Sequence, residues 1–432
     1  MNNFTIGTFS ALSNEEAIKL LGETFDDELK YLQSANSTPE TLTNATSGAE
    51  FITPSKQLYN ADYDEVNRTL LGMLALKWIL ANDYQSFTQA QAPAVVLQQE
   101  SFDELRKLCL NQFEDSDNIL PLLVAIVIND LGKSPRLAEA VEKATGKPMA
   151  DANHDEVVYI AAESDMIHSL ERLEETQRKD VLLGLKLGST LNIAQFAQAE
   201  SVPGSLEGAK VMAGNRRAFN LKFLEVLFDV AGAAANIDAR GAKAMIEPVY
   251  RNYKMVHPIL LDVVENRGTL RQNYDKLLAA HGEKLKQQGF RPLSVDNPAE
   301  RALLRLMIMG RSTSNKKQAD LFDAAFNRLS QLERQVLVDG LNVDGTNDGE
   351  AILPYYMPAI ISEALKNTSD EPEGKIEALA SLMRLLGRVY NGSKPKKGQA
   401  GTIKEVNLRH VTKVIHGEAF KSDPRTLDQL AV

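Results

Sequence analysis

Residues 120–135 read LPLLVAIVINDLGKSP and give the clearest indication of the fold. Ten consecutive residues, Leu120 to Asn129, carry no charge and most are large and apolar, so this segment is expected to be buried on most sides. The first charged residue, Asp130, would then lie at the mouth of a core. A carboxylate in that place needs an ion pair, hydrogen bonds or a metal ion, because an isolated buried charge is very unstable.

Helical periodicity extends from this segment in both directions. Apolar residues repeat at steps of three and four over residues 62–79, and similar patterns cover residues 215–235, 298–309 and 376–390. No alternation of apolar and polar residues is long enough to require a large sheet. Only the end of residues 403–417 has the composition of a strand. The sequence therefore predicts an all-α fold.

The composition narrows the classes of function. A net charge of −10 argues against a nucleic-acid backbone as the main partner. Cys109 is the only cysteine, which excludes a disulfide framework and a cluster of thiolate metal ligands. No apolar run approaches the roughly 20 residues that cross a bilayer, and the first residues lack the pattern of a secretory signal. We therefore expect a cytoplasmic protein without a membrane segment.

Two later stretches add chemically capable side chains. Residues 151–162, DANHDEVVYIAA, place His154 and Asp155 side by side at the start of a predicted helix. The stretch LEVLFDVAGAA places Glu225 one turn before Asp229, so both carboxylates share one helix face. The small residues that follow Asp229 allow another helix to approach closely.

The apolar helix that ends in Asp-Leu-Gly-Lys resembles the HD-domain superfamily of metal-dependent phosphohydrolases and their oxygenase relatives. The resemblance spans about residues 100–240, and it implies an HD-like core with additional helical layers. Asp130 matches the family's metal-bridging aspartate, and Gly132 and Lys133 match the Gly-Lys that follows it. The histidine that precedes this aspartate in the family is replaced by Asn129, and no histidine occurs before His154. The full-length arrangement also resembles uncharacterised fungal proteins of similar length, which implies no function.

The resemblance implies a metal-dependent phosphohydrolase that acts on a small phosphorylated or nucleotide-like substrate. It assigns three kinds of role: Asp130, His154 and Asp229 as ligands of a divalent Fe, Mn or Mg ion; Lys133, Asp155 and Glu225 as catalytic groups; and Arg216 and Arg217 as substrate-binding groups. The ion would lower the pKa of a bound water and polarise a phosphoryl oxygen. Lys133 would neutralise the developing charge, with Asp155 or Glu225 as the base.

Structural roles explain the same residues without a reaction. Asp130 would cap a turn, with Gly132 in a left-handed conformation. His154 would lie beside a helix N-cap. Glu225 and Asp229 would form a solvated face paired with lysine and arginine. The alternative function is accordingly a non-catalytic helical binding protein with a degenerate HD-like site; an oxygenase relative is disfavoured because a diiron site needs more histidines than the chain can place.

The regions expected along the chain are an N-terminal helix and linker at 1–55, the HD-like core at 56–290, a C-terminal helical region at 291–390, and a basic loop and tail at 391–432. One loop resembles a calcium site, because Asp344, Thr346 and Asp348 occupy its first, third and fifth places. Its twelfth place, which needs a bidentate glutamate, is Tyr355. The sequence therefore predicts a turn-rich surface loop there.

Overall fold

The computed structural model describes residues 4–37, 51–391 and 401–431. The predicted all-α fold is confirmed: helices form the described chain apart from one pair of short strands. The greater part of the predicted linker (38–50) and of the predicted basic loop (392–400) lies outside the described residues. Within the described ranges, no helix combines the length and the apolar content needed to cross a membrane.

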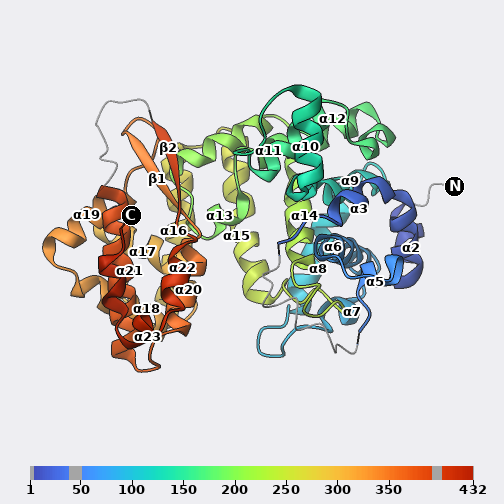
Figure 1. Ribbon diagram of the computed structural model, residues 1–432. Coiled ribbons are helices and arrows are strands. Elements are labelled where there is room, and N and C mark those ends of the chain that lie inside the picture. Colours follow the sequence, from blue (N-terminus) through green and yellow to red (C-terminus); the bar gives the residue numbers. More distant parts are fainter. Residues whose placement is uncertain (1–3, 38–50, 392–400, 432) are drawn as a thin grey trace. The chain divides into compact units, whose positions relative to one another are not determined.

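The chain divides into two compact units (Figure 1). Unit 1 comprises residues 1–190 and 211–257, and unit 2 comprises residues 191–210 and 258–432. The boundary falls inside the 3-10 helix η4 (Pro203–Met212) and inside α15 (Glu247–Val264). The boundaries expected from the sequence at 55, 290 and 390 do not coincide with this division.

Unit 1 is built entirely from helices within its described residues. They are α1 (Ile6–Ser10), α2 (Asn14–Thr24), α3 (Asp26–Leu32), α5 (Pro54–Tyr59), α6 (Asp64–Leu80), α7 (Tyr84–Thr88), α8 (Gln99–Gln112), α9 (Leu120–Asn129), η2 (Leu131–Lys133), α10 (Pro135–Thr145), α11 (His154–Glu163), η3 (His168–Arg172), α12 (Glu175–Gly188) and α14 (Arg216–Gly232).

The centre of unit 1 is α6, against which α14, α9 and α8 pack. Every residue of α6 is buried except Asp64 and Arg68. The two central helices approach closely, because a β-carbon added to Gly232 of α14 would lie 2.0 Å from the carbonyl oxygen of Arg68. This contact confirms the prediction that small residues at the end of α14 allow another helix to approach closely. The predicted burial of α9 is also confirmed, since all its residues from Pro121 to Ile128 are buried.

Unit 2 combines helices with a two-stranded sheet. Its elements are α13 (Ile193–Ala197), α16 (Leu270–Gln287), α17 (Pro298–Met309), α18 (Lys316–Arg328), α19 (Gln331–Leu341), β1 (Glu350–Tyr355), α20 (Met357–Lys366), α21 (Pro372–Asn391), β2 (Thr402–Asn407), α22 (Val411–Ile415), α23 (Glu418–Ser422) and η5 (Pro424–Gln429). A continuous apolar core joins residues of α17, α18, α19, α20 and α21.

The two strands of unit 2 correct the sequence-based expectation. β1 and β2 are parallel, with Glu350 opposite Thr402 and Tyr355 opposite Asn407. The predicted surface loop at 343–356 is therefore wrong in its second half, which is strand β1. The strand expected at the end of residues 403–417 is also misplaced: the beginning of that stretch forms β2, and its end forms helix α22.

Candidate functional site

Charged side chains from four separate parts of unit 1 gather at the N-terminal end of α6 and the C-terminal end of α9. We call them the charge cluster: Glu65 and Arg68 of α6; Asp130 and Lys133 around η2; His154 and Asp155 of α11; and Lys222, Glu225 and Asp229 of α14. Six of the nine were predicted as site residues from the sequence.

The short helix η2 places Lys133 between two carboxylates. Its ammonium lies 2.8 Å from Oδ2 of Asp130 and 3.4 Å from Oε1 of Glu65. Gly132 makes this placement possible, because its α-carbon packs directly on the backbone carbonyl of His154. The expected left-handed conformation of Gly132 is wrong, since this glycine lies within η2 and outside the positive-φ residues. The expected side-chain cap by Asp130 is absent as well.

His154 stands at the rim of the cluster. Its Nε2 lies 3.8 Å from Oδ1 of Asp130 and 3.6 Å from Oδ2 of Asp155, and its side chain is 38% exposed. Asn153 caps α11 by accepting a 2.8 Å hydrogen bond from the backbone amide of Glu156. The expectation that His154 lies beside a helix N-cap is therefore confirmed, and the cap fixes the point at which the imidazole leaves the helix.

The α14 side of the cluster is buried rather than solvated. Lys222 forms an ion pair with Glu225 and donates a 3.1 Å hydrogen bond to Oδ1 of Asn129. Asp229, one turn after Glu225, is half-buried. Burial raises the pKa of Asp229, and the nearby charge of Asp130 raises it further. The acid of α14 and the acid that follows α9 therefore act on each other electrostatically.

The carboxylates of the cluster differ in protonation. Burial alone would raise the pKa of Asp130, but the charge and hydrogen bond of Lys133, with Arg68, lower it to about 2. Burial and repulsion by Asp130 raise the pKa of Glu65 to about 7. Burial likewise raises the pKa of Glu225 to about 8, against the attraction of Lys222. Of these three carboxyl groups, Asp130 is therefore the strongest acid and Glu225 the weakest.

Several buried polar atoms of the cluster keep unused hydrogen-bonding capacity. Among the described residues, Oε2 of Glu65, Oε1 of Glu225 and Nε of Arg68 have no hydrogen-bond partner. Buried polar atoms in native proteins are usually paired with protein, water or ligand. These three atoms therefore leave hydrogen-bonding capacity unused in the buried part of the cluster.

The residues do not fit the expected metal centre. In the described part of the chain, no three histidine, cysteine, aspartate or glutamate side chains are arranged to hold an ion. Asp130 is instead bound by Lys133, which places an ammonium where a metal would compete. Asn129, the residue that replaces the family's histidine, binds Lys222. The protein's own cations thus neutralise the acids that a divalent ion would need.

The two arginines predicted to bind substrate lie elsewhere. Arg216 and Arg217 are exposed at the start of α14, and Arg217 forms a 2.8 Å ion pair with Asp180. Twelve residues of helix separate Arg217 from Asp229, which corresponds to about 18 Å along the axis. The structure therefore places Arg217 well away from the end of the charge cluster that holds Asp229.

Three members of the cluster were missed from the sequence: Glu65, Arg68 and Lys222. A usable indication was present for the first two, because they precede the long apolar run of α6 just as Asp130 follows that of α9. A charge at either end of a fully buried helix lies at the mouth of a core. Lys222 was expected to be solvated, and only the packing of α12 over α14 makes it buried.

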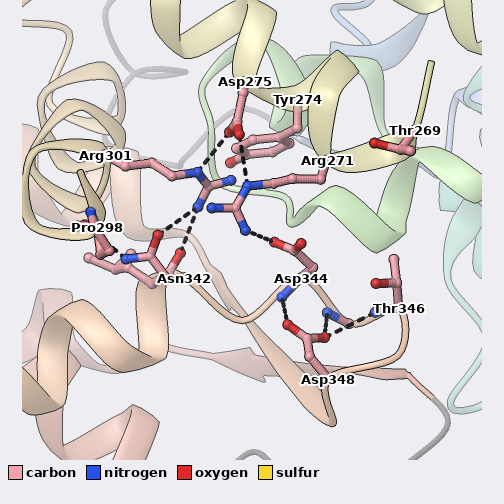
Figure 2. A network of polar contacts seen from close by, with 12 residues as sticks. Thr269, Arg271, Tyr274, Asp275, Pro298, Arg301, Asn342, Asp344, Thr346 and Asp348 are labelled. Atoms are coloured by element: carbon pink, nitrogen blue, oxygen red, sulfur yellow. Dashed lines mark hydrogen bonds and ion pairs between the residues drawn. The ribbon is translucent and has the colours of Figure 1, made fainter. Parts of the chain in front are cut away.

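Unit 2 contains a second polar network, formed around Arg271 of α16 and Arg301 of α17 (Figure 2). Arg301 is fully buried and its Nε lies 2.7 Å from Oδ1 of Asp275, whose other oxygen binds Nε of Arg271 at 2.8 Å. Nη1 of Arg271 in turn lies 2.6 Å from Oδ1 of Asp344. The network therefore ties α16 and α17 to the loop that resembled a calcium site.

Asp344 and Asp348 of that loop already bind other groups of the protein. Asp348 accepts hydrogen bonds from the backbone amides of Asp344 and Gly345, at 2.8 and 3.1 Å, and Asp344 pairs with Arg271 (Figure 2). The carboxylates close the turn before β1, which is a structural task. Charge cluster residues in unit 1 consequently remain the stronger candidates for a functional site.

Comparison with known proteins gives one match. A family model described as a family of unknown function, DUF6829, matches residues 18–427. No curated protein and no solved structure matches the chain.

Proposed function

The chain belongs to the family of unknown function DUF6829, and we propose that its charge cluster binds a small phosphorylated or nucleotide-like molecule without the help of a metal ion. One observation carries this proposal: the ammonium of Lys133 contacts both Asp130 and Glu65. The buried acids thereby hold a cation of the protein in place at a partly open site, where it can meet an anion.

The partly exposed members of the cluster supply donors for an anionic group. The side chains of Arg68, Lys133 and His154 are 15%, 18% and 38% exposed, whereas those of Glu65 and Asp130 are 0% and 6% exposed. An ammonium has three donors and a guanidinium has five. Lys133 directs two of its donors at Asp130 and Glu65, and Arg68 makes one contact with Glu65. Both cations therefore keep donors that can bind phosphate oxygens.

The rim also contains acceptors, which narrows the class of ligand. Asp155 lies 3.6 Å from His154, and Asp229 is the half-buried acid of α14. They would repel a ligand that carries only negative charge, but they accept hydrogen bonds from hydroxyl or amino groups. A molecule that joins a phosphate to a sugar satisfies both kinds of group, and this favours a sugar phosphate or a nucleotide over inorganic phosphate.

Calorimetric titration with AMP in the presence of EDTA tests the proposal. We expect saturable binding by the wild-type chain and weaker binding of adenosine, which lacks the phosphate. Lys133→Met should weaken AMP binding about tenfold or more, because it removes a charge-assisted contact. Arg217→Met, a matched change on α14 about 18 Å along the helix axis from Asp229, should leave it unaltered. Circular dichroism establishes that each variant is folded.

Two results would overturn the proposal. One is the lack of saturable binding of both AMP and ribose 5-phosphate to the folded wild-type chain. The other is equal affinity of the wild type and a folded Lys133→Met variant for AMP. If Arg217→Met weakens binding while Lys133→Met does not, the phosphate binds at the start of α14 instead.

A metal-dependent phosphohydrolase is the second candidate: His154 lies 3.8 Å from Asp130, but an added ion would have to displace Lys133 from that carboxylate. Its test is the release of phosphate from AMP after addition of Mg, Mn or Fe, together with metal analysis of the purified chain. Activity that is lost in Asp130→Asn and His154→Ala supports the enzyme. Intact AMP in the presence of all three metals supports the binding protein.

We also propose a cytoplasmic location, on the basis of cysteine usage. The chain has a single cysteine, Cys109, which is buried and unpaired. Proteins of oxidising compartments commonly contain disulfides, and this chain can form none within itself. Fractionation of cells that express the tagged chain tests the location, and recovery in a secretory fraction would contradict it.

A further inference from the structure

Unit 1 contains a cavity of about 400 Å³ on the other side of η2 from the charge cluster. We call it the Tyr31 cavity. Residues from α3, from η2 and α10, and from the segment before η3 line it: Asp27, Glu28, Lys30, Tyr31, Leu131, Arg136, Leu137, Met166, Ile167 and His168. Its volume lies within the range of pockets that bind small organic molecules.

The inner wall of the Tyr31 cavity is apolar. Leu131, Leu137 and Ile167 are buried, and Met166 and the ring of Tyr31 extend the same surface. Such a wall gains free energy by covering the apolar part of a ligand, at roughly 25 cal/mol per Å². The cavity therefore suits a molecule with an apolar or aromatic body.

Within the described part of the chain, one cation beside the cavity has no ion-pair partner. Glu28 accepts a 2.9 Å hydrogen bond from the backbone amide of Ser169, and Asp27 lies 3.2 Å from Nδ1 of His168. Lys30 pairs with Asp26 at 2.5 Å.

Arg136, at the start of α10, is the exception. Among the described residues it forms no ion pair or hydrogen bond, and its guanidinium lies over the ring of Tyr31, 5.9 Å from the centroid. A guanidinium held on an aromatic face keeps its planar donor edge free to bind a carboxylate through two hydrogen bonds.

We propose that the Tyr31 cavity binds a small organic acid with an aromatic or branched apolar body. The carboxylate lies against Arg136, and the body lies against Tyr31, Leu137 and Ile167. This site is separate from the charge cluster, because Leu131 and Lys133 point from the same short helix into different surroundings. The inference does not depend on the function proposed for the cluster.

Phenylacetate and its uncharged analogue phenylacetamide are suitable probes, and calorimetry or protein NMR measures their binding to the full chain. We expect saturable binding of phenylacetate and binding of the amide that is about tenfold weaker, because the amide cannot form the charge-assisted pair. Arg136→Gln should weaken phenylacetate binding to a similar extent, whereas Arg136→Lys should retain part of it. Since Arg136 is exposed, these variants are expected to fold.

Arg425→Gln, the same change at an exposed arginine of unit 2, serves as the matched control. Unchanged phenylacetate binding in this control, together with weaker binding in Arg136→Gln, supports the proposal. The proposal is overturned if the acid and the amide bind equally, if neither saturates at millimolar concentration, or if Arg136→Gln binds phenylacetate as tightly as the wild type does.

Discussion

Gly132 and His154 touch through their backbones: a β-carbon added to Gly132 would lie 1.9 Å from the carbonyl oxygen of His154. Real β-carbons do not approach a backbone oxygen this closely. The contact joins η2 to the first turn of α11, and these two elements carry Lys133 and His154 into the charge cluster. Glycine is therefore required here for close approach, although its backbone conformation is ordinary.

Gly132→Ala is expected to destabilise the chain by about 3 kcal/mol or more, because backbone must move to admit the methyl group. Urea unfolding followed by circular dichroism measures the loss. Gly7→Ala is a matched control, since no atom lies within 4 Å of the added β-carbon in an exposed helix. The control should be neutral or slightly stabilising. Equal stability of the two variants would contradict the role given to Gly132.

Lys133 holds together two acids that would otherwise repel each other. Lys133→Met removes the cation from Asp130 and Glu65 and should cost about 3 kcal/mol, because it leaves buried charge without a partner. Lys143→Met, an exposed change on α10, should alter stability by less than about 0.5 kcal/mol.

A double variant provides the sharper test of this ion pair. If Lys133 and Asp130 act as a pair, Lys133→Met combined with Asp130→Asn should cost less than the sum of the two single changes. Additive costs measured in the same urea titrations would show that the two residues act independently.

Glu65 should make stability depend on pH near neutrality. Its pKa in the folded chain is raised from the usual 4.5 to about 7, so the folded state keeps a proton that the unfolded state releases. The contribution is therefore fully favourable below pH 4.5 and is lost as the pH rises to about 7. Across that range the wild type should lose about 3 kcal/mol relative to Glu65→Gln, which cannot ionise.

Unfolding free energies measured at several pH values test this expectation. The difference between the wild type and Glu65→Gln should change with pH, whereas the difference between the wild type and Glu139→Gln, an exposed change on α10, should stay constant. Parallel profiles for the wild type and Glu65→Gln would contradict the raised pKa.

Local sequence patterns predicted the helices of this chain well. The helix that begins at Pro298 ends at Met309 as expected, because apolar periodicity and capping residues act within one segment. Strand β1 was missed, and β2 was placed too late in the sequence, for the opposite reason. β1 is only six residues long and pairs with β2, which begins 52 residues after β1 starts, so neither strand is specified by its own neighbourhood.

In the candidate site, too, features set by neighbouring residues were predicted, whereas contacts between residues far apart in the sequence were not. The long apolar run before Asp130 placed this acid at the mouth of a core, and the structure confirms its burial. The cations that neutralise the acids could not be assigned, because Lys222 lies 93 residues beyond Asn129, the residue it binds. A metal ion and a lysine ammonium can each neutralise the same buried carboxylate. Which of the two does so depends on side chains that only the three-dimensional packing brings together.

In unit 2, Arg305 is expected to hold the segment around Ala199–Ser201 in place through hydrogen bonds to backbone carbonyl oxygens. It is fully buried, and it donates to the carbonyl oxygens of Ala199, Ser201 and Leu341 at 3.1, 2.7 and 3.0 Å. The ring of Tyr274 supports the guanidinium at 5.7 Å. Because lysine cannot donate in several directions of one plane, even the charge-conserving change should leave some of these carbonyls unpaired.

Arg305→Lys should therefore destabilise unit 2 by about 2–4 kcal/mol and increase hydrogen exchange in the segment around Ala199–Ser201. Arg328→Lys, at an arginine with surface ion pairs, is the matched control and should change stability by less than about 0.5 kcal/mol. Mass spectrometry of the exchanged peptides measures the local effect separately from global unfolding. If exchange around Ala199 is unchanged in Arg305→Lys, the carbonyl contacts do not hold the loop.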